Sequence, residues 1–235
     1  MRYYFCHEAA RRGSQFLADV ACVKGKRGKS TVAIEQAAPP GVLDEACWET
    51  VTRIIRERRS NLNVDLERPV PRELIDELIG LAITAPNHYR THPWRFAVLT
   101  GDARARIGQI IADAVARKPE TPAAYVERQR VQFLRAPAVI AAAAAPDEDP
   151  IKHFENKHAV AAGVQNMLLA ATAAGLASAW RSGPGMVDPE VSRAAKEALG
   201  FSPDDEIVAF VYLGYPIAPP GVRPTPLTHV TYLDE

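Results

Sequence analysis

Three short polar segments interrupt otherwise apolar stretches of the chain, and each contains groups that could bind an anion. They are Arg58–Arg59–Ser60, the run from Thr84 to His88, and Trp180–Arg181–Ser182–Gly183. Each follows a stretch with the periodicity of a helix or strand, and binding sites are usually built on loops at the ends of such elements. The arginine guanidinium is a planar fork of donors that suits phosphate, and serine adds a hydroxyl donor. The segments therefore predict a phosphorylated ligand, although arginines that end a helix can simply complement its dipole.

Charge balance and histidine spacing argue against several other functions. Lysine plus arginine and aspartate plus glutamate both number 28, so no long-range field favours nucleic acid or an anionic membrane as a partner. The cysteines Cys6, Cys22 and Cys47 lie in the first fifth of the chain, and a reducing cytoplasm is the expected compartment. His153 and His158 lack the HExxH spacing of a zinc site, so no metal is expected. No nucleophile or acid–base pair stands out, and we assign no catalytic residue.

Residues 1–41 differ in pattern from the rest of the chain. Their periodicity is poor, basic residues cluster in KGKRGKS, and the segment closes in APPG, which is typical of an extension. The basic cluster resembles the end of a phosphate-binding loop, but Val23 stands where that loop needs its first glycine. No secretory signal is evident, and a transit peptide stays open. We expect 1–41 to be a flexible or draped extension and 42–235 to form one domain.

Beyond residue 42, apolar periodicity predicts helices and strands in alternation. The predicted helices span 43–59, 71–86, 102–117, 122–135, about 153–174 and 188–200, and the predicted strands span 94–101, 137–145, 176–183 and 206–216. Asp188 and Pro189 mark a helix start, while Gly175 and Gly200 mark helix ends. Alternation alone suggests a layered parallel α/β fold, yet the Gly-rich turn of a dinucleotide-binding version is missing.

The alanine-rich run from Ala159 to Trp180 is long enough to span a bilayer. Gln165, Asn166 and the preference for alanine over leucine instead favour a helix buried inside protein. The proline-rich tail 216–230 can neither pair as a central strand nor form a helix, so we expect it to lie across a surface.

The order of these motifs resembles the FMN-dependent nitroreductase family, and most closely its YdjA-like branch. RERRSNLNV looks like that branch's Arg-Arg-Ser signature after the first helix, and AITAPNHYRTHPWRFAVLTG resembles its Ala-Pro-Asp/Asn-His segment leading into a strand. GLASAWRSG and IVAFVYLGYP resemble its Trp-Arg-Ser-Gly turn and late strand, and RPTPLTHVTYL its Pro-rich arm. The resemblance covers roughly four-fifths of the chain and leaves out the first 41 residues.

The resemblance implies an α+β fold: a three-layer α/β/α sandwich with a largely antiparallel sheet, which replaces the parallel expectation. It also implies a homodimer with two FMN sites at the subunit interface. In that setting the small side chains of the alanine-rich helix would permit close helix packing.

Residue by residue, the resemblance assigns flavin contacts to the three polar segments and a nucleotide region to the alanine-rich helix. The flavin contacts are Arg58, Arg59, Ser60, Thr84, His88, Trp180, Arg181 and Ser182; the nicotinamide-nucleotide region is Ala170, Ala171, Thr172, Ala173, Ala174 and Gly175. Alanine has no distinctive chemistry, so helix packing competes as an explanation of the second set. Thr84 stands where the branch commonly has a larger basic residue, so it could donate a hydrogen bond but supplies no charge.

Another departure concerns the charge of the reduced flavin. Many nitroreductases place a lysine two residues after the signature serine, where it can stabilise negative charge on the ring; here the residue is Leu62. The YdjA-like branch also lacks this lysine. We hypothesise that Arg181 or His88 takes part of its role.

The implied function is an FMN-dependent NAD(P)H oxidoreductase that passes hydride in a ping-pong scheme to a nitroaromatic, a quinone or a related small acceptor. Two alternatives share the fold. One is an enzyme that fragments the reduced flavin, similar to 5,6-dimethylbenzimidazole synthase, and the other is a non-catalytic flavin-binding or storage protein.

Overall fold

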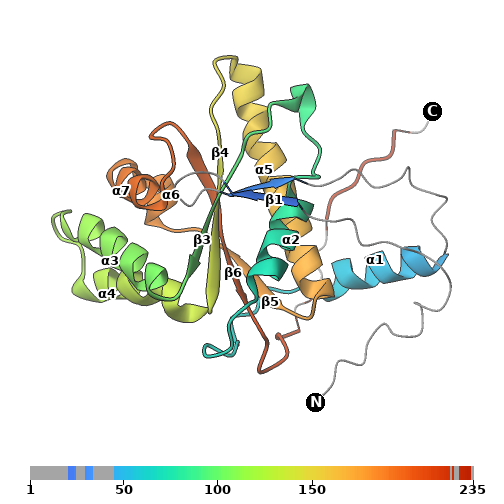
Figure 1. Ribbon diagram of the computed structural model, residues 1–235, viewed down its shortest axis with the longest axis horizontal. Helices are drawn as coiled ribbons and strands as arrows, with labels where there is room; N and C mark the ends of the chain where they lie inside the picture. Colours follow the sequence, from blue (N-terminus) through green and yellow to red (C-terminus); the bar gives the residue numbers. More distant parts are fainter. Residues whose placement is uncertain (1–20, 25–29, 34–44, 223, 225–227, 234–235) are drawn as a thin grey trace. The chain divides into compact units, whose positions relative to one another are not determined.

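The computed structural model of the chain (Figure 1) describes residues 21–24, 30–33, 45–222, 224 and 228–233. The chain divides into two compact units, Met1–Glu49 and Thr50–Glu235. In the first unit, β1 (Ala21–Lys24) and β2 (Ser30–Ala33) pair as an antiparallel hairpin that the sequence pattern did not predict. The other residues of the expected extension 1–41, including most of the basic cluster, lie outside the described residues.

The second unit contains a four-stranded sheet in the order β3-β4-β6-β5. Its strands are β3 (Trp94–Thr100), β4 (Ala138–Ala144), β5 (Ala177–Arg181) and β6 (Glu206–Gly214), and every pair is antiparallel. The parallel sheet suggested by alternating helices and strands is therefore wrong, and the antiparallel sheet implied by the family resemblance is confirmed. A continuous apolar strand such as β4 is typical of parallel sheets, but any strand covered on both faces has this pattern.

Helices cover both faces of the sheet and make three layers (Figure 1). On one face lie α2 (Arg72–Ala82) and α5 (Pro150–Ala173); on the other lie α3 (Asp102–Ala116), α4 (Ala123–Val131), α6 (Pro184–Val187) and α7 (Pro189–Leu199). Along β4, Ile140 and Ala142 join the core under α2 and α5, whereas Val139 and Ala141 join the core under α3 and α7. The α/β/α sandwich is thus confirmed.

Capping residues set the ends of the helices. Asp188 accepts hydrogen bonds from the first amides of α7, and Gly200 ends that helix with a left-handed φ of 73°, as predicted. Gly175, at φ 75°, follows the end of α5. However, α5 begins at Pro150, three residues before the predicted start at His153, because Asp149 caps it in the same Asp-Pro arrangement that starts α7.

Close backbone contact joins α2 to α5. A Cβ at Gly163 would lie 2.6 Å from the carbonyl oxygen of Ala82, so only glycine allows the last turn of α2 to approach α5 at this position. Part of α5 is thus buried against protein, as the sequence suggested. Among the described residues, no helix is both long enough and apolar enough to cross a membrane.

Candidate functional site

The first and third polar segments meet at the outer edge of β5. Helix α1 (Glu45–Glu57) ends just before Arg58, and the chain then runs alongside β5, where Ser60 forms a parallel bridge with Ser178. The amide of Asn61 donates to the carbonyl oxygen of Ser178 at 3.0 Å. This edge therefore carries Arg58, Arg59 and Ser60 from one segment and Trp180, Arg181 and Ser182 from the other; we call these six residues the arginine corner.

Asn61, which sequence reasoning missed, fixes the path of the chain at the arginine corner. It is buried, its side-chain nitrogen donates to the carbonyl oxygen of Ala218 at 2.9 Å, and its side-chain oxygen accepts from the amide of Asn63 at 2.9 Å. The segment also pairs with the chain after β6, since Val64 forms an antiparallel bridge with Pro216. The only signal in the sequence is an asparagine directly after the signature serine.

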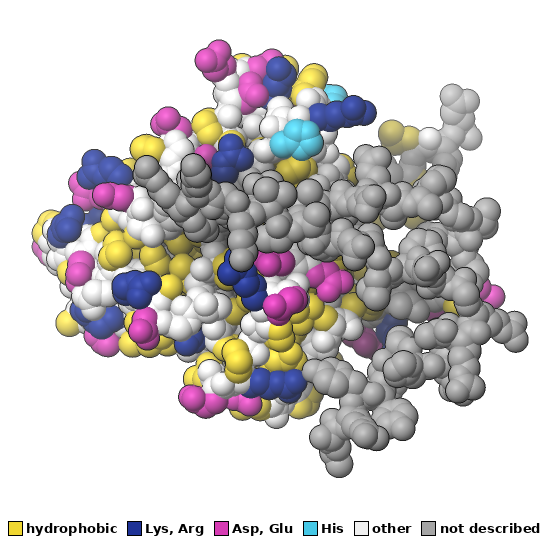
Figure 2. Space-filling model, viewed as in Figure 1, with side chains coloured by type: hydrophobic (Ala, Val, Ile, Leu, Met, Phe, Trp, Pro, Cys, Tyr) yellow, Lys and Arg dark blue, Asp and Glu magenta, His cyan; other side chains and the backbone are white. Residues whose placement is uncertain are grey.

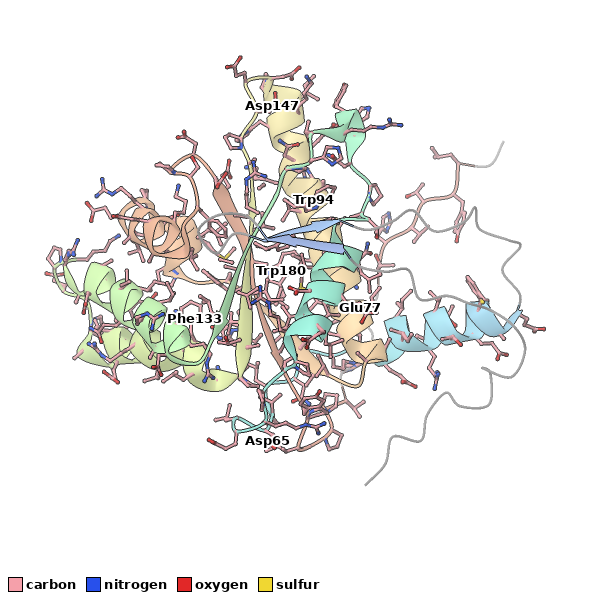
Figure 3. All side chains as sticks on the ribbon, in the orientation of Figure 1. Asp65, Glu77, Trp94, Phe133, Asp147 and Trp180 are labelled. Atoms are coloured by element: carbon pink, nitrogen blue, oxygen red, sulfur yellow. The ribbon has the colours of Figure 1, made fainter. Side chains whose placement is uncertain are left out.

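Within the arginine corner, Trp180 and Arg181 lie on opposite faces of β5. Trp180 is opposite Val211, whose side chain belongs to the core under α2 and α5, and Arg181 is opposite Phe210, which belongs to the other core. Figure 3 shows Trp180 on the α2/α5 side of the sheet and Phe133 on the other side. A single ligand can therefore contact both side chains only at the edge or the end of the strand.

Arg181 lies near a buried tyrosine on its face of the sheet. Tyr212 is 3% exposed and its ring stacks on Phe133 at a centroid distance of 6.0 Å. Burial raises the pKa of the Tyr212 hydroxyl well above its ordinary value, although the charges of Arg181 and Arg135 act to lower it. The hydroxyl thus stays protonated beside two guanidinium groups.

The positive charge of the arginine corner is not neutralised within the described part of the chain. No carboxylate there lies within ion-pair distance of Arg58, Arg59 or Arg181. Arg59 donates instead to the carbonyl oxygens of Arg56 and Arg58, the latter at 2.8 Å, and so covers the end of α1. The buried hydroxyl of Ser178, beside Ser60, also has no hydrogen-bond partner among the described residues. A donor set with unpaired guanidinium groups and hydroxyls fits an anionic, phosphorylated ligand.

The second polar segment lies against the start of α5 and not against β5. We call residues 87–92 the histidine loop; it includes the single-turn helix η2 (His88–Arg90). His88 Nδ1 lies 2.8 Å from Glu155 Oε2 on α5, and the rings of His88 and Tyr89 stack at 3.9 Å. Figure 2 shows histidine side chains and basic side chains together at this end of the second unit.

Thr84 precedes the histidine loop at the end of α2. Its hydroxyl donates to the carbonyl oxygen of Leu81 at 2.7 Å and so terminates the helix. Its side chain is exposed, which leaves its lone pairs available. Trp94, after the loop, is partly buried and packs against the core under α2 and α5.

The arginine corner and the histidine loop do not converge within one copy of the chain. The start of α5 is fixed to the start of β6 by His153 and Glu206, whose side chains lie 2.7 Å apart. Arg181 is opposite Phe210, four residues beyond Glu206 on β6, which is about 13 Å at 3.3 Å per residue, and Ser178, beside Ser60, is about 23 Å from Glu206 by the same measure. No hydrogen bond or ion pair among the described residues joins the arginine corner to the histidine loop, so the three polar segments form two clusters in one copy.

The expected nucleotide region is the C-terminal end of α5. Ala171 is buried in the core, and Thr172 donates its hydroxyl to the carbonyl oxygen of Leu168 at 3.0 Å, so both residues serve the helix itself. Ala173, Ala174 and Gly175 are exposed, while Ala170 is partly buried. Within this region, only the last three residues present an open surface to a ligand.

Two surface cavities are lined by none of the residues of the three polar segments. One, of about 570 Å³, lies between α3 and α7 beside Arg117 and Arg193; the other, of about 620 Å³, lies beside Pro146 and His153. Within the described ranges, no three histidine, cysteine or acidic side chains are grouped so that they could hold a metal ion.

The antiparallel sheet between two helical layers is similar to that of solved structures of nitroreductase-like proteins. A solved structure from Bacillus cereus, described as a nitroreductase-like family protein, aligns with 26% identity and a TM-score of 0.64 over 80% of this chain and 95% of its own. A solved structure from Desulfovibrio desulfuricans, provisionally named a nitroreductase in complex with FMN, aligns with 25% identity and a TM-score of 0.57 over 75% of this chain and 92% of its own.

Sequence comparison gives the family directly. The model of the nitroreductase family matches residues 55–215. The Escherichia coli protein YdjA, which carries the provisional name NAD(P)H nitroreductase, is 31% identical over 173 residues, or 71% of this chain and 91% of the relative. The chain therefore belongs to the nitroreductase family, whose name denotes an oxidoreductase, and the resemblance drawn from the sequence motifs is confirmed.

Proposed function

We propose that the chain binds FMN and uses it to oxidise NADH or NADPH and reduce a small acceptor such as a nitroaromatic or a quinone. Support comes from its family membership and from related proteins described with FMN or named as NAD(P)H nitroreductases. The observation that carries the proposal is the arginine corner, where Arg58, Arg59 and Arg181 have no carboxylate partner among the described residues. Those unpaired charges suit the phosphate of a flavin mononucleotide.

In this mechanism the flavin supplies the hydride chemistry, and the chain supplies binding and orientation. Arg58 and Ser60 would bind the phosphate and ribityl chain, while Arg59 holds the end of α1 through its bonds to backbone carbonyls. Trp180, with 37% of its surface exposed, would limit water at the α2/α5 side of β5. Donor and acceptor would use one open site in turn, which is a ping-pong scheme, so no side chain has to act as nucleophile or general base.

We further propose that the protein works as a homodimer with flavin between two copies. The arginine corner and the histidine loop are separate in one copy, so His88 and Thr84 could reach the flavin held by the arginine corner of the partner. Helix α1 has no buried residue, and its Val51 and Ile55 side chains are each 51% exposed. Apolar side chains at that spacing form one face of a helix, which a second copy could cover.

The domain boundaries and the compartment are also proposals. Residues 42–235 would form the flavin-binding domain and residues 1–41 an extension. The cytoplasm would suit a chain whose cysteines are confined to its first fifth. Ala173 to Gly175, the exposed end of α5, would be the part of the expected nucleotide region that a nicotinamide nucleotide could contact.

The test is the visible absorption spectrum of the purified chain after incubation with excess FMN and desalting, followed by anaerobic addition of NADPH or NADH. We expect a retained flavin spectrum that bleaches with one of the nucleotides. Retained flavin that neither nucleotide reduces would favour the storage alternative. Loss of flavin and appearance of a fragmentation product, after incubation in the dark with reductant and air, would favour the fragmenting alternative. A chain that retains no FMN would contradict the proposal.

A further inference from the structure

We propose that Thr91 and Asn156 are positioning residues that hold the histidine loop in an otherwise disfavoured conformation, and so fix the place of His88 toward the flavin. The inference rests on the proposed function for the flavin and on the structure for the loop. Thr91 lies within the segment that resembles the family but is not one of its signature residues, and Asn156 lies outside the motifs. Their side chains are joined by a hydrogen bond that links the loop to α5.

The backbone of the histidine loop adopts left-handed torsion angles at three residues that are not glycine. The φ angles are 61° at Tyr89, 52° at Arg90 and 49° at His92. Residues other than glycine rarely adopt this region of backbone torsion angles, and residues with bulky side chains adopt it least often. A loop with three such residues among four keeps its conformation only when neighbouring groups hold it there, and such strain is concentrated at functional sites.

A continuous chain of hydrogen bonds from α5 supplies that restraint. Asn156 on α5 is 2% exposed and donates from Nδ2 to the carbonyl oxygen of Ala145 at 3.1 Å. Its Oδ1 accepts from Thr91 Oγ1 at 2.5 Å, and Thr91 Oγ1 accepts from Asn87 Nδ2 at 3.0 Å. Asn87 Oδ1 then accepts from the backbone amide of His92 at 2.9 Å. The bonds begin at Ala145, directly after β4, and finish at the amide of His92 in the strained backbone.

The same turn of α5 also holds His88. Glu155, the neighbour of Asn156, pairs with His88 Nδ1 at 2.8 Å. Tyr89 stacks on the His88 ring, and Lys152 lies 5.5 Å from the centroid of the Tyr89 ring. The loop therefore has one attachment through the Thr91 hydroxyl and another through the His88 ring. Only the first can be removed without touching a proposed flavin contact.

Thr91 offers a closely matched pair of substitutions. Thr91→Val keeps the shape of the side chain and removes the hydroxyl, whereas Thr91→Ser keeps the hydroxyl. Asn156→Ala breaks the same chain of bonds at its buried end. Thr121→Val is the control, because the Thr121 hydroxyl donates to a backbone carbonyl of α3 at 3.3 Å, far from the loop in the sequence.

Three quantities are measured on the full chain: amide hydrogen exchange over 87–92 without FMN, the Kd for FMN, and the melting temperature. We expect Thr91→Val and Asn156→Ala to speed exchange of the His92 amide at least about tenfold and to weaken FMN binding about threefold to tenfold. In Thr91→Ser and Thr121→Val, the exchange rate of the His92 amide and the Kd for FMN should each stay within about twofold of the parent value. The double variant should be no worse than the worse single one, because both act through one chain of bonds.

Two results would overturn the inference. Unchanged exchange in Thr91→Val would mean that the hydroxyl does not hold the loop, whatever happens to FMN. Faster exchange with an unchanged Kd would mean that the loop is held but does not position a flavin contact. If the parent chain retains no FMN, the proposed function fails and with it the role toward flavin, while the exchange rates still decide whether Thr91 and Asn156 hold the loop.

Discussion

The arginine corner and the histidine loop carry the two halves of the proposed flavin site, and they are built in opposite ways. In the arginine corner the backbone is ordinary, but Arg58 and Arg181 have no ion-pair partner among the described residues. In the histidine loop the side chains of Asn87, His88 and Thr91 all have partners, while three backbone φ angles are disfavoured. One half would bind through charge and the other through fixed geometry, so they should respond differently to the same kind of substitution.

Removing the charge of the arginine corner should have the largest effect on binding. Hydrogen bonds to charged groups contribute about 1.5–3 kcal/mol, so Arg58→Ala or Arg181→Ala should each weaken FMN binding roughly tenfold to a hundredfold. Higher salt should weaken FMN binding to the parent chain, and it should weaken FMN binding to the two variants less. The Kd can be measured by quenching of flavin fluorescence.

Arg106→Ala is the control for this prediction, because Arg106 is exposed on α3 and has no ion pair among the described residues. It should bind FMN within about twofold of the parent chain. An equal loss in Arg106→Ala would show that the effect of the arginines is one of overall charge and not of a built site.

The contact between α2 and α5 should matter next, because it places Thr84 and the histidine loop. In Gly163→Ala the new Cβ would lie 2.6 Å from a backbone carbonyl oxygen of α2, which a side-chain rotation cannot relieve. Such overpacking costs about 1–3 kcal/mol. The free energy of unfolding from urea titration should fall by that amount. Gly221→Ala, where nothing lies within 4 Å of the new Cβ, should change it by less than about 0.5 kcal/mol.

The two halves also differ in how far they could be predicted from the sequence. The residues of the arginine corner follow from local signals: a helix that ends before Arg58 and a strand that ends at Arg181. The conformation of the histidine loop does not, because it depends on Asn156, which is 65 residues from Thr91 in the chain. The left-handed backbone at Tyr89, Arg90 and His92 could not be predicted either, because sequence rules expect glycine at residues with positive φ.

Fold prediction failed where local and distant information compete. Asp188, Pro189 and Gly200 predict both ends of α7 correctly. The same Asp-Pro pair at Asp149 starts α5 three residues before the start that apolar periodicity predicts. Alternation of helices and strands suggested a parallel sheet because it describes chain order and not the direction in which each strand joins. The four-residue helix α6 and the hairpin of β1 and β2 are too short to show a period.

The reduction potential of the bound flavin should distinguish the two halves more finely. Leu62 leaves the usual charge-stabilising lysine missing, and Arg181 or His88 is the candidate to replace it. His88 is paired with Glu155, whereas Arg181 has no carboxylate partner in the described part of the chain, so Arg181→Ala should lower the potential more than His88→Ala. A tenfold change in a two-electron equilibrium corresponds to about 30 mV, which dye equilibration resolves. If neither substitution moves the potential, neither residue stabilises the reduced ring.

The smallest effect should come from Glu206, which ties the start of α5 near the histidine loop to β6. Burial raises the pKa of Glu206, but hydrogen bonds and attraction from Lys157 and His153 outweigh it and leave the pKa below its ordinary value of 4.5. A lowered pKa in the folded state stabilises the fold above pH 4.5, and this contribution is lost as the pH falls below that value. Because these side chains are about 40% exposed, Glu206→Gln should cost less than about 1 kcal/mol at pH 7.

The difference in unfolding free energy between the parent and Glu206→Gln should shrink as the pH is lowered from 7 to about 3, since the parent carboxylate is then protonated as well. Glu127→Gln, which removes an exposed pair with Arg130, is the control and should show a smaller difference at pH 7. Hydrogen exchange of the histidine loop should stay unchanged in Glu206→Gln, because the Thr91–Asn156 bond does not pass through this carboxylate. Faster exchange there would mean that the position of α5 as a whole, and not the hydroxyl of Thr91, sets the geometry of the loop.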